Sequence, residues 1–156
     1  MVRTHVHPAW LSECGASGCA FDHSIRGVAP PDIAVIETVE SPPGTIATVD
    51  TGHVASGDPL MLVGYGCEET LNDPSAPRRL KYAMTEAIDA SSSLNGFAQR
   101  AYFETGGVES EGAASLCPGD SGGPVFRAGS GARIVGINAY YTFGDESGIS
   151  ETNLHT

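Results

Sequence analysis

Ser121 has the surroundings best suited to chemistry, because it lies in the run Cys-Pro-Gly-Asp-Ser-Gly-Gly-Pro at residues 117–124. The nearby glycines leave its hydroxyl unobstructed and let the preceding backbone N–H groups point into the same space. An acyl-transfer nucleophile and its oxyanion hole require this geometry. The alternative is an ordinary serine in a glycine-rich β-turn. The full eight-residue run is more specific than a bare G-x-S-x-G pattern, so the sequence favours a nucleophile.

The candidate carboxylate that would support such a serine is Asp32. A serine hydroxyl is a weak nucleophile at neutral pH and needs a base, usually a histidine that a buried carboxylate holds in place. Asp32 comes directly before the apolar residues 33–36, where a buried acid must find a partner. The alternative is an aspartate that only caps the start of a strand.

Several segments together resemble the trypsin-like (chymotrypsin-fold) serine endopeptidases. Residues 119–124 match the G-D-S-G-G-P nucleophile motif of that family, and residues 31–35 resemble the D-I-A-[LV]-[LIV] segment around its catalytic aspartate. Three further segments resemble the family in the right order: residues 6–10 (H-P-x-[YW]), residues 64–66 (G-[WY]-G) and residues 134–137 (the strand leading to the specificity pocket).

The resemblance implies a role for each matching residue. Asp32 would orient the base and Ser121 would attack the scissile carbonyl, while the N–H groups of Gly119 and Ser121 would form the oxyanion hole. Asp120 resembles the acid that pairs with a newly cut N-terminal amine in activated members of the family. Its alternative is a plain turn residue in a glycine-rich loop.

The resemblance also places a substrate pocket. Ser115 falls where the family has the floor of the S1 pocket, Tyr140 and Tyr141 fall on its wall, and Gly148 opens the segment that resembles the last strand. The floor carries no acid, so a preference for Arg or Lys at P1 is not supported. A bulky Tyr141 would narrow the pocket and favour small or medium uncharged P1 residues. Alternatively, Tyr141 turns outward and the pocket stays deep.

The catalytic histidine is the main departure from the family. That histidine belongs to a T-A-A-H-C segment upstream of the H-P-x-[YW] segment, and the chain begins at the later one. None of the five histidines matches it, although His23 is nearest to Asp32 in sequence. The resemblance thus implies a piece of a protease, truncated at both ends, that is inactive or severely impaired alone; a natural chain encoded this way is the alternative. The histidines are His5, His7, His23, His53 and His155.

The distribution of strand-like and turn-like segments predicts an all-β fold. Twenty glycines and ten prolines break the 156 residues into short stretches, and residues 85–90 have only weak helical character. The resemblance implies a double antiparallel β-barrel whose first barrel is incomplete, with a remnant over 1–43 and the linker and second barrel over 44–156. Strands are expected over residues 33–39, 45–49, 59–63, 80–88, 97–104, 124–127 and 133–142.

The four cysteines predict two disulfides. Cys14 and Cys19 bracket a flexible Gly-Ala-Ser-Gly stretch, which leaves Cys67 to pair with Cys117. The Cys14–Cys19 and Cys67–Cys117 pairing is one of three connectivities and is preferred because it joins near neighbours first. The alternative is four buried thiols in a cytosolic protein. Zinc is disfavoured because no C-x-x-C pair is present, so an oxidising, extracellular setting is expected.

The charge and hydropathy of the chain exclude two classes of partner, nucleic acids and the membrane interior. The formal charge of −11 leaves no basic stripe for nucleic acid, and no apolar run is long enough to span a membrane. The resemblance implies a secreted enzyme with a polypeptide substrate, a protein inhibitor as a further partner, and no cofactor or metal. An α/β-hydrolase is rejected, because Pro124 prevents the required helix and only His155 follows. A catalytically inactive homologue that acts as a binding module is the rival function.

Overall fold

The structure, a computed structural model, describes residues 2–14, 30–41, 43–65, 79–88, 102–107, 114–129, 131–143 and 150–156. Within these residues it has one short helix and nine strands, so the predicted all-β class is confirmed. The elements in chain order are β1 (Arg3–Val6), α1 (Pro8–Cys14), β2 (Ala34–Glu37), β3 (Thr48–Val49), β4 (Pro59–Gly64), β5 (Lys81–Ile88), β6 (Phe103–Gly106), β7 (Pro124–Arg127), β8 (Arg133–Phe143) and β9 (Ser150–His155).

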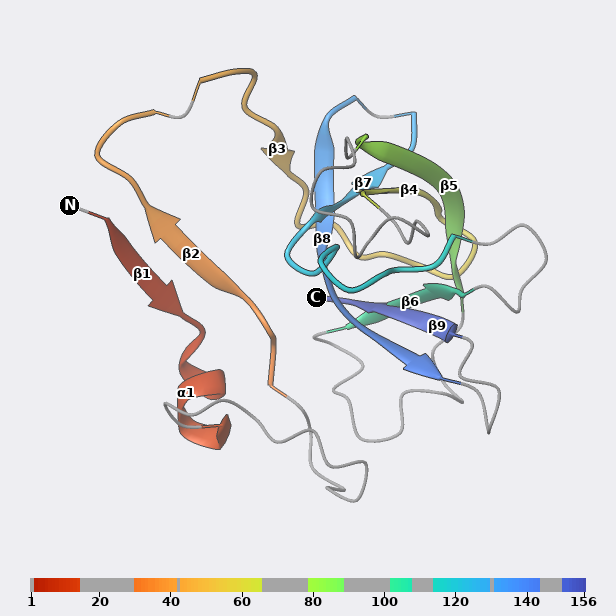
Figure 1. The fold of residues 1–156 in the computed structure, drawn as a ribbon, viewed down its shortest axis with the longest axis horizontal. Coiled ribbons are helices and arrows are strands. Elements are labelled where there is room, and N and C mark those ends of the chain that lie inside the picture. The colour runs from red at the N-terminus through yellow and green to blue at the C-terminus, as the bar shows by residue number, and fades with distance from the viewer. Residues whose placement is uncertain are drawn as a thin grey trace.

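Six strands close into an antiparallel barrel. The sheet order β8-β7-β4-β5-β6-β9 returns to β8 through a further β8–β9 pairing, and the short β3 adds to β8 in parallel. The long β8 closes the barrel because its first half pairs with β7 and its second half pairs with β9. The register of both pairings shifts by a residue at irregular positions along these strands. The barrel is on the right of Figure 1, with the C-terminus beside β9.

Alternating strand residues fill the barrel. Leu60 and Leu62 of β4 point inward with Val125 of β7 and Ala87 of β5, and Leu116 joins them from the loop before β7. Side chains two apart on a strand share a face, so the inward faces of β4, β5 and β7 supply this apolar core.

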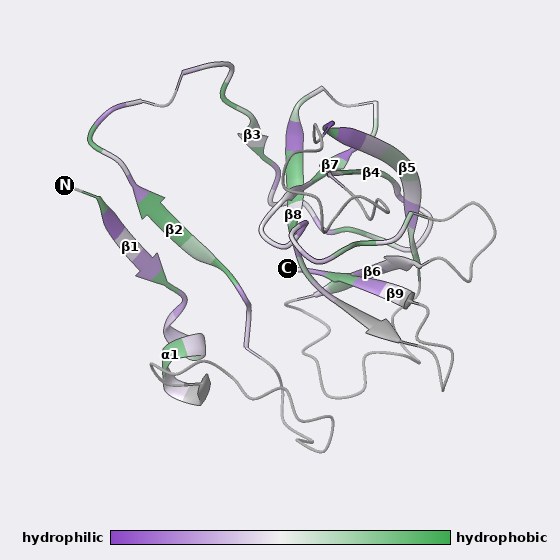
Figure 2. Cartoon of the chain, viewed as in Figure 1, coloured by the Kyte–Doolittle hydropathy of each residue, from purple (hydrophilic) through white to green (hydrophobic). Residues whose placement is uncertain are grey.

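A two-stranded ribbon of β1 and β2 lies apart from the barrel (Figure 1). The two strands pair antiparallel, from Arg3 opposite Glu37 to Val6 opposite Ala34. Figure 2 colours most of β2 as hydrophobic, yet Val35 is 62% and Ile36 63% exposed. Because neighbouring residues of a strand point to opposite faces, these two side chains lie on different faces of β2. Both faces of this strand therefore carry uncovered apolar surface.

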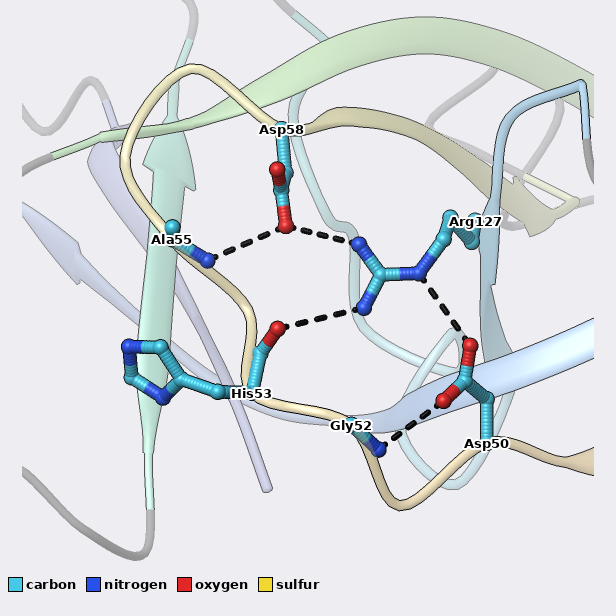
Figure 3. A network of polar contacts seen from close by, with 6 residues as sticks. All are labelled: Asp50, Gly52, His53, Ala55, Asp58 and Arg127. Atoms are coloured by element: carbon cyan, nitrogen blue, oxygen red, sulfur yellow. Dashed lines mark hydrogen bonds and ion pairs between the residues drawn. The ribbon is translucent and has the colours of Figure 1, made fainter.

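Arg127, at the end of β7, ties the segment after β3 to the barrel (Figure 3). Its guanidinium donates from Nε to Asp50 at 3.2 Å, from Nη1 to Asp58 at 2.6 Å and from Nη2 to the carbonyl of His53 at 3.3 Å. The same carboxylates accept backbone N–H bonds from Gly52 and Ala55. These bonds and Arg127 hold the pKa of Asp50 and of Asp58 below the usual value.

The strand predictions are confirmed for β2, β4, β5, β7 and β8 and in part for β3 and β6, although the ends shift by a few residues. Residues 85–88, which had weak helical character, belong to β5, because pairing with β4 and then with β6 decides their conformation. Neither β1 nor α1 was expected. The helix begins with proline at its first position, where the missing N–H costs nothing, and the Nδ1 atom of His7 accepts the N–H of Ala9.

No helix among the described residues is long and apolar enough to cross a membrane.

Candidate active site

Ser121 is exposed on a tight loop between Cys117 and β7. Two glycines make the loop possible, because Gly119 and Gly122 have φ angles of 100° and 81°, in the region that residues with a Cβ rarely adopt. The N–H of Asp120 donates to the carbonyl of Cys117 at 2.9 Å, and the N–H of Gly123 donates to the carbonyl of Asp120 at 3.0 Å. Two successive turns therefore present the serine at the surface.

The predicted oxyanion donors are the N–H groups of Gly119 and Ser121. Among the described residues, no backbone hydrogen bond uses either group. The N–H groups of Cys117, Asp120, Gly122 and Gly123 in the same loop all donate hydrogen bonds, and these bonds fix the loop. The loop therefore holds the N–H groups of Gly119 and Ser121 in place without using them in backbone hydrogen bonds. Donors that are fixed in advance and aimed outward are what stabilisation of a developing oxyanion requires.

The buried carboxylate of Asp120 fixes this loop to β4. Its Oδ1 accepts the N–H of Tyr65 at 2.8 Å and its Oδ2 accepts the N–H of Cys117 at 3.1 Å. Gly64 leaves room for it, since a Cβ at that position would overlap the carboxylate. The predicted pairing of Asp120 with an N-terminal amine stays a prediction.

A second anchor comes from β8. The side-chain Nδ2 of Asn138 donates to the carbonyl of Asp120 at 3.2 Å, its N–H donates to the carbonyl of Gly123 at 2.8 Å, and its carbonyl accepts the N–H of Gly122 at 2.8 Å. A Cβ on Gly123 would lie 2.9 Å from the Asp120 carbonyl and 3.1 Å from Asn138 Nδ2. The close approach of β8 to the loop thus requires a glycine at position 123.

Behind Asn138 lies a group of fully buried polar side chains. His155 of β9 contacts Asn138 Oδ1 through Nδ1 at 3.1 Å and Thr105 Oγ1 through Nε2 at 3.0 Å, and its ring lies 5.0 Å from that of Phe103. Burial lowers the pKa of His155 to about 3, so its ring is neutral at neutral pH. Sequence analysis missed this group. The one sign of this polar group in the sequence was the presence of polar residues within otherwise strand-like segments.

Asp32 is connected to the barrel through Tyr102, which precedes β6. The N–H of Asp32 donates to the phenolic oxygen of Tyr102 at 3.1 Å, and that hydroxyl donates to the carbonyl of Pro30 at 2.6 Å. Partial burial raises the pKa of the Asp32 carboxyl. Sequence analysis did not single out Tyr102, because nothing in its own segment marks it as a partner of residues 70 positions away.

Residues 12–152 match the sequence model of the Trypsin family. This chain belongs to the trypsin family. The peroxisomal leader peptide-processing protease of the mouse is 29% identical over 126 residues, which are 81% of this chain and 19% of the mouse protein. The crystal structure of an inactivated protease paralogue of the scabies mite matches with a TM-score of 0.63 and 19% sequence identity, over 99% of this chain and 60% of that one.

The likeness to the mite structure shows the fold, which is chymotrypsin-like. The described residues contain one closed six-stranded barrel, with β1, β2 and α1 outside it, and the division into a first-barrel remnant over 1–43 and a second barrel over 44–156 stays a prediction. The chain spans about one fifth of the mouse protein and three fifths of the mite chain.

Membership of the trypsin family makes the position of the histidines important. In the described residues, no hydrogen bond joins a histidine to Ser121 or Asp32. His5 contacts Glu37 at 3.4 Å, His7 accepts the N–H of Ala9, His53 offers its carbonyl to Arg127 and His155 lies inside the barrel. His23 lies outside the described residues.

Ser115 and Tyr140, the described candidates for the predicted pocket, both lie next to β9. Asn153 of β9 accepts the N–H of Leu116 through Oδ1 at 2.8 Å and donates from Nδ2 to the carbonyl of Ala114 at 2.7 Å, which holds the segment of Ser115. Tyr140 of β8 pairs with Leu154, the next residue of β9. The side chain of Tyr141 and all of Gly148 lie outside the described residues.

Cys117 is buried, and no cysteine among the described residues is a free thiol. Cys19 and Cys67 lie outside the described residues, as does the side chain of Cys14. Both proposed pairings stay predictions.

Proposed function

We propose that the chain carries the nucleophile half of a serine-type endopeptidase. The supporting observation is the exposed Ser121 on a loop in which the N–H groups of Gly119 and Ser121 bond to no backbone carbonyl of the described residues. In the proposed reaction, Ser121 Oγ attacks the scissile carbonyl and gives its proton to a base. The two N–H groups stabilise the oxyanion, and the base then protonates the leaving amine. Water hydrolyses the acyl-enzyme in a second, equivalent step.

We propose that Asp32 orients that base, a role that none of the four histidines described by the structure is placed to fill. Two observations support this assignment. Partial burial disfavours the charged form of Asp32 and raises its pKa, and an imidazolium beside it would offset that cost. The four described histidines are all placed elsewhere, and removal of the base from such a triad typically costs about 10⁶ in kcat. The chain alone is therefore expected to be severely impaired.

The proposed substrate is a polypeptide with a small or medium uncharged residue at P1. Ser115 supplies no charge to the proposed pocket floor, and Tyr140 of β8, a proposed wall residue, is half-buried. A protein inhibitor that presents a similar segment is the proposed second partner. Secretion, with the disulfides Cys14–Cys19 and Cys67–Cys117, is the proposed setting, since enzymes of this family are often exported.

Hydrolysis of p-nitrophenyl esters of acylated amino acids, with imidazole added to replace the missing base, tests this proposal. We expect turnover that depends on imidazole, is lost in Ser121→Ala and is greatest for small or medium uncharged side chains. Ser115→Asp is the matched specificity variant and should shift the preference toward Arg and Lys. A clear Arg or Lys preference of the unmodified chain would contradict the pocket assignment.

A binding module without catalysis is the second candidate. It is favoured by the absence, among the described residues, of any histidine bonded to Ser121 or Asp32. If a folded chain shows no turnover with or without imidazole, this candidate replaces the first.

A further inference from the structure

The peptide unit between Asp120 and Ser121 carries one of the two proposed oxyanion donors. A trans peptide is planar, with its C=O and N–H pointing in opposite directions. Whatever holds the carbonyl of Asp120 therefore also aims the N–H of Ser121. Two donors hold that carbonyl: the N–H of Gly123 at 3.0 Å and the side chain of Asn138 at 3.2 Å.

The amide of Asn138 can have only one orientation. Its partner at the loop is a carbonyl, which only accepts, so the atom facing Asp120 must be the NH₂ group. Oδ1 then faces Nδ1 of His155 at 3.1 Å and needs a hydrogen from it. The imidazole must therefore carry its proton on Nδ1.

The other side of the ring fits the same tautomer. With its proton on Nδ1, His155 has a lone pair on Nε2, which can accept the hydroxyl of Thr105 at 3.0 Å. The Thr105 oxygen in turn lies 3.1 Å from Nδ2 of Asn153, whose two hydrogens are shared with the carbonyls of Gly106 and Ala114. The hydrogens of Thr105, His155 and Asn138 thus all point toward the nucleophile loop. Hydrogen bonds aligned in this way polarise and strengthen one another.

Burial makes this relay rigid. Asn138 is 1% exposed, and Thr105, Asn153 and His155 are fully buried, so water cannot replace a missing partner. A buried imidazole with both nitrogens satisfied in one tautomer resists protonation, which agrees with its low pKa of about 3.

We propose that His155 and Asn138 are positioning residues for the oxyanion hole: a one-way relay from Thr105 through His155, protonated on Nδ1, and Asn138 to the carbonyl of Asp120 aims the N–H of Ser121. The catalytic meaning of this relay rests on the proposed function of Ser121. The relay itself rests only on the contacts inside the barrel.

The tautomer is measured first, by long-range ¹H–¹⁵N correlation NMR of the uniformly labelled 156-residue chain. The relay requires the Nδ1–H form of His155, with an unprotonated Nε2, near neutral pH. An Nε2–H form would overturn it, because Nδ1 could then donate nothing to Asn138. This measurement needs no variant and no activity.

Two substitutions of similar size separate the relay from simple packing. His155→Asn places an amide where Nδ1 was and can still donate to Asn138, whereas His155→Gln places its amide near Nε2 and leaves Asn138 Oδ1 without a donor. We expect the Gly123 amide to exchange with solvent roughly tenfold faster in His155→Gln than in His155→Asn. The Ala128 amide, which donates to the carbonyl of Pro59 at the end of β7 opposite Gly123, is the internal reference. Equal Gly123 rates in the two variants would overturn the relay.

Asn138→Asp is the alternative variant if the histidine variants do not fold. It replaces the NH₂ group that donates to the Asp120 carbonyl with an oxygen and leaves the rest of the side chain unchanged in size. It should also speed exchange of the Gly123 amide relative to that of Ala128, and unchanged exchange would overturn the relay. Fluorophosphonate labelling with imidazole supplies the functional readout: His155→Gln should lower kinact about tenfold relative to His155→Asn while KI stays unchanged. If Ser121 of the unmodified chain never reacts, the proposed function fails, whereas the tautomer and exchange results still decide the relay.

Discussion

The N–H of Asp32 donates to the phenolic oxygen of Tyr102 at 3.1 Å, across 70 residues of sequence. The same hydroxyl donates to the carbonyl of Pro30 at 2.6 Å. One buried side chain next to β6 of the barrel thus holds both sides of the turn that carries the proposed catalytic aspartate. The position of Asp32 relative to the barrel depends on this phenol.

Tyr102→Phe should therefore loosen the Asp32 turn. The change removes only the hydroxyl, so it leaves the Pro30 carbonyl and the Asp32 N–H without this partner at a cost of about 1–3 kcal/mol in the free energy of unfolding. Urea titration measures the loss. Tyr82→Phe is the control, because Tyr82 is 73% exposed on β5 and should give no loss. Equal stability of the two variants would show that the phenol does not hold the turn.

Stability should fall as the pH drops below the ordinary pKa of histidine, because of His155. Its pKa is lowered from 6.5 to about 3 in the folded chain, so the unfolded chain binds the proton first. The contribution of a neutral His155 is complete above about pH 6.5 and decreases toward pH 3, with a slope that approaches about 1.4 kcal/mol per pH unit. Urea titrations at several pH values should give this slope for the unmodified chain but not for His155→Asn. The same slope in both would contradict the buried neutral imidazole.

Arg127→Ala should release the segment after β3 from the barrel, because it removes the shared partner of Asp50 and Asp58 (Figure 3). The lowered pKa values of these carboxylates mean that their contribution is present above the unfolded value of 3.8 and is lost as the pH falls below it. We expect a lower thermal midpoint near neutral pH and a smaller difference in strong acid. Arg79→Ala, at an exposed position before β5, is the matched control. Equal midpoints for the two variants would contradict the proposed anchor.

The uncovered apolar residues of β2 should drive self-association. Exposed strands with free edges and apolar side chains pair readily with other chains. Ile36→Lys should shift the chain toward the monomer in sedimentation velocity, whereas Thr4→Lys, at the paired position on β1, should change it little. A sharp monomer peak of the unmodified chain would refute this prediction.

The parts predictable from the sequence were those with a local or motif signal. Short apolar runs between glycine and proline clusters gave most barrel strands, and the run around Ser121 together with residues 31–35 gave the family. The strand β1 carried no such signal. Its residues 3–6 are mostly polar and exposed, and they form a strand only because β2 lies beside them.

The buried residues that hold the Ser121 loop and the Asp32 turn were not predictable either, because their contacts depend on how distant segments pair. Asn138 and His155 are adjacent only because β8 and β9 pair with Asn138 opposite His155, and Tyr102 meets Asp32 through the fold alone. A polar residue inside a strand gives no sign, in one sequence, of whether it faces water or a buried partner. Register decides that, and register is a property of the closed barrel.

The most direct test of the account is fluorophosphonate labelling of the folded 156-residue chain with and without imidazole, mapped by mass spectrometry. In the labelling step, Ser121 Oγ bonds to phosphorus, fluoride leaves and the base takes the proton. We predict an adduct on Ser121 that depends on imidazole and disappears in Ser121→Ala. An adduct that forms equally well without imidazole would show that the chain supplies its own base. No adduct in either condition would show that Ser121 is not a nucleophile in this chain.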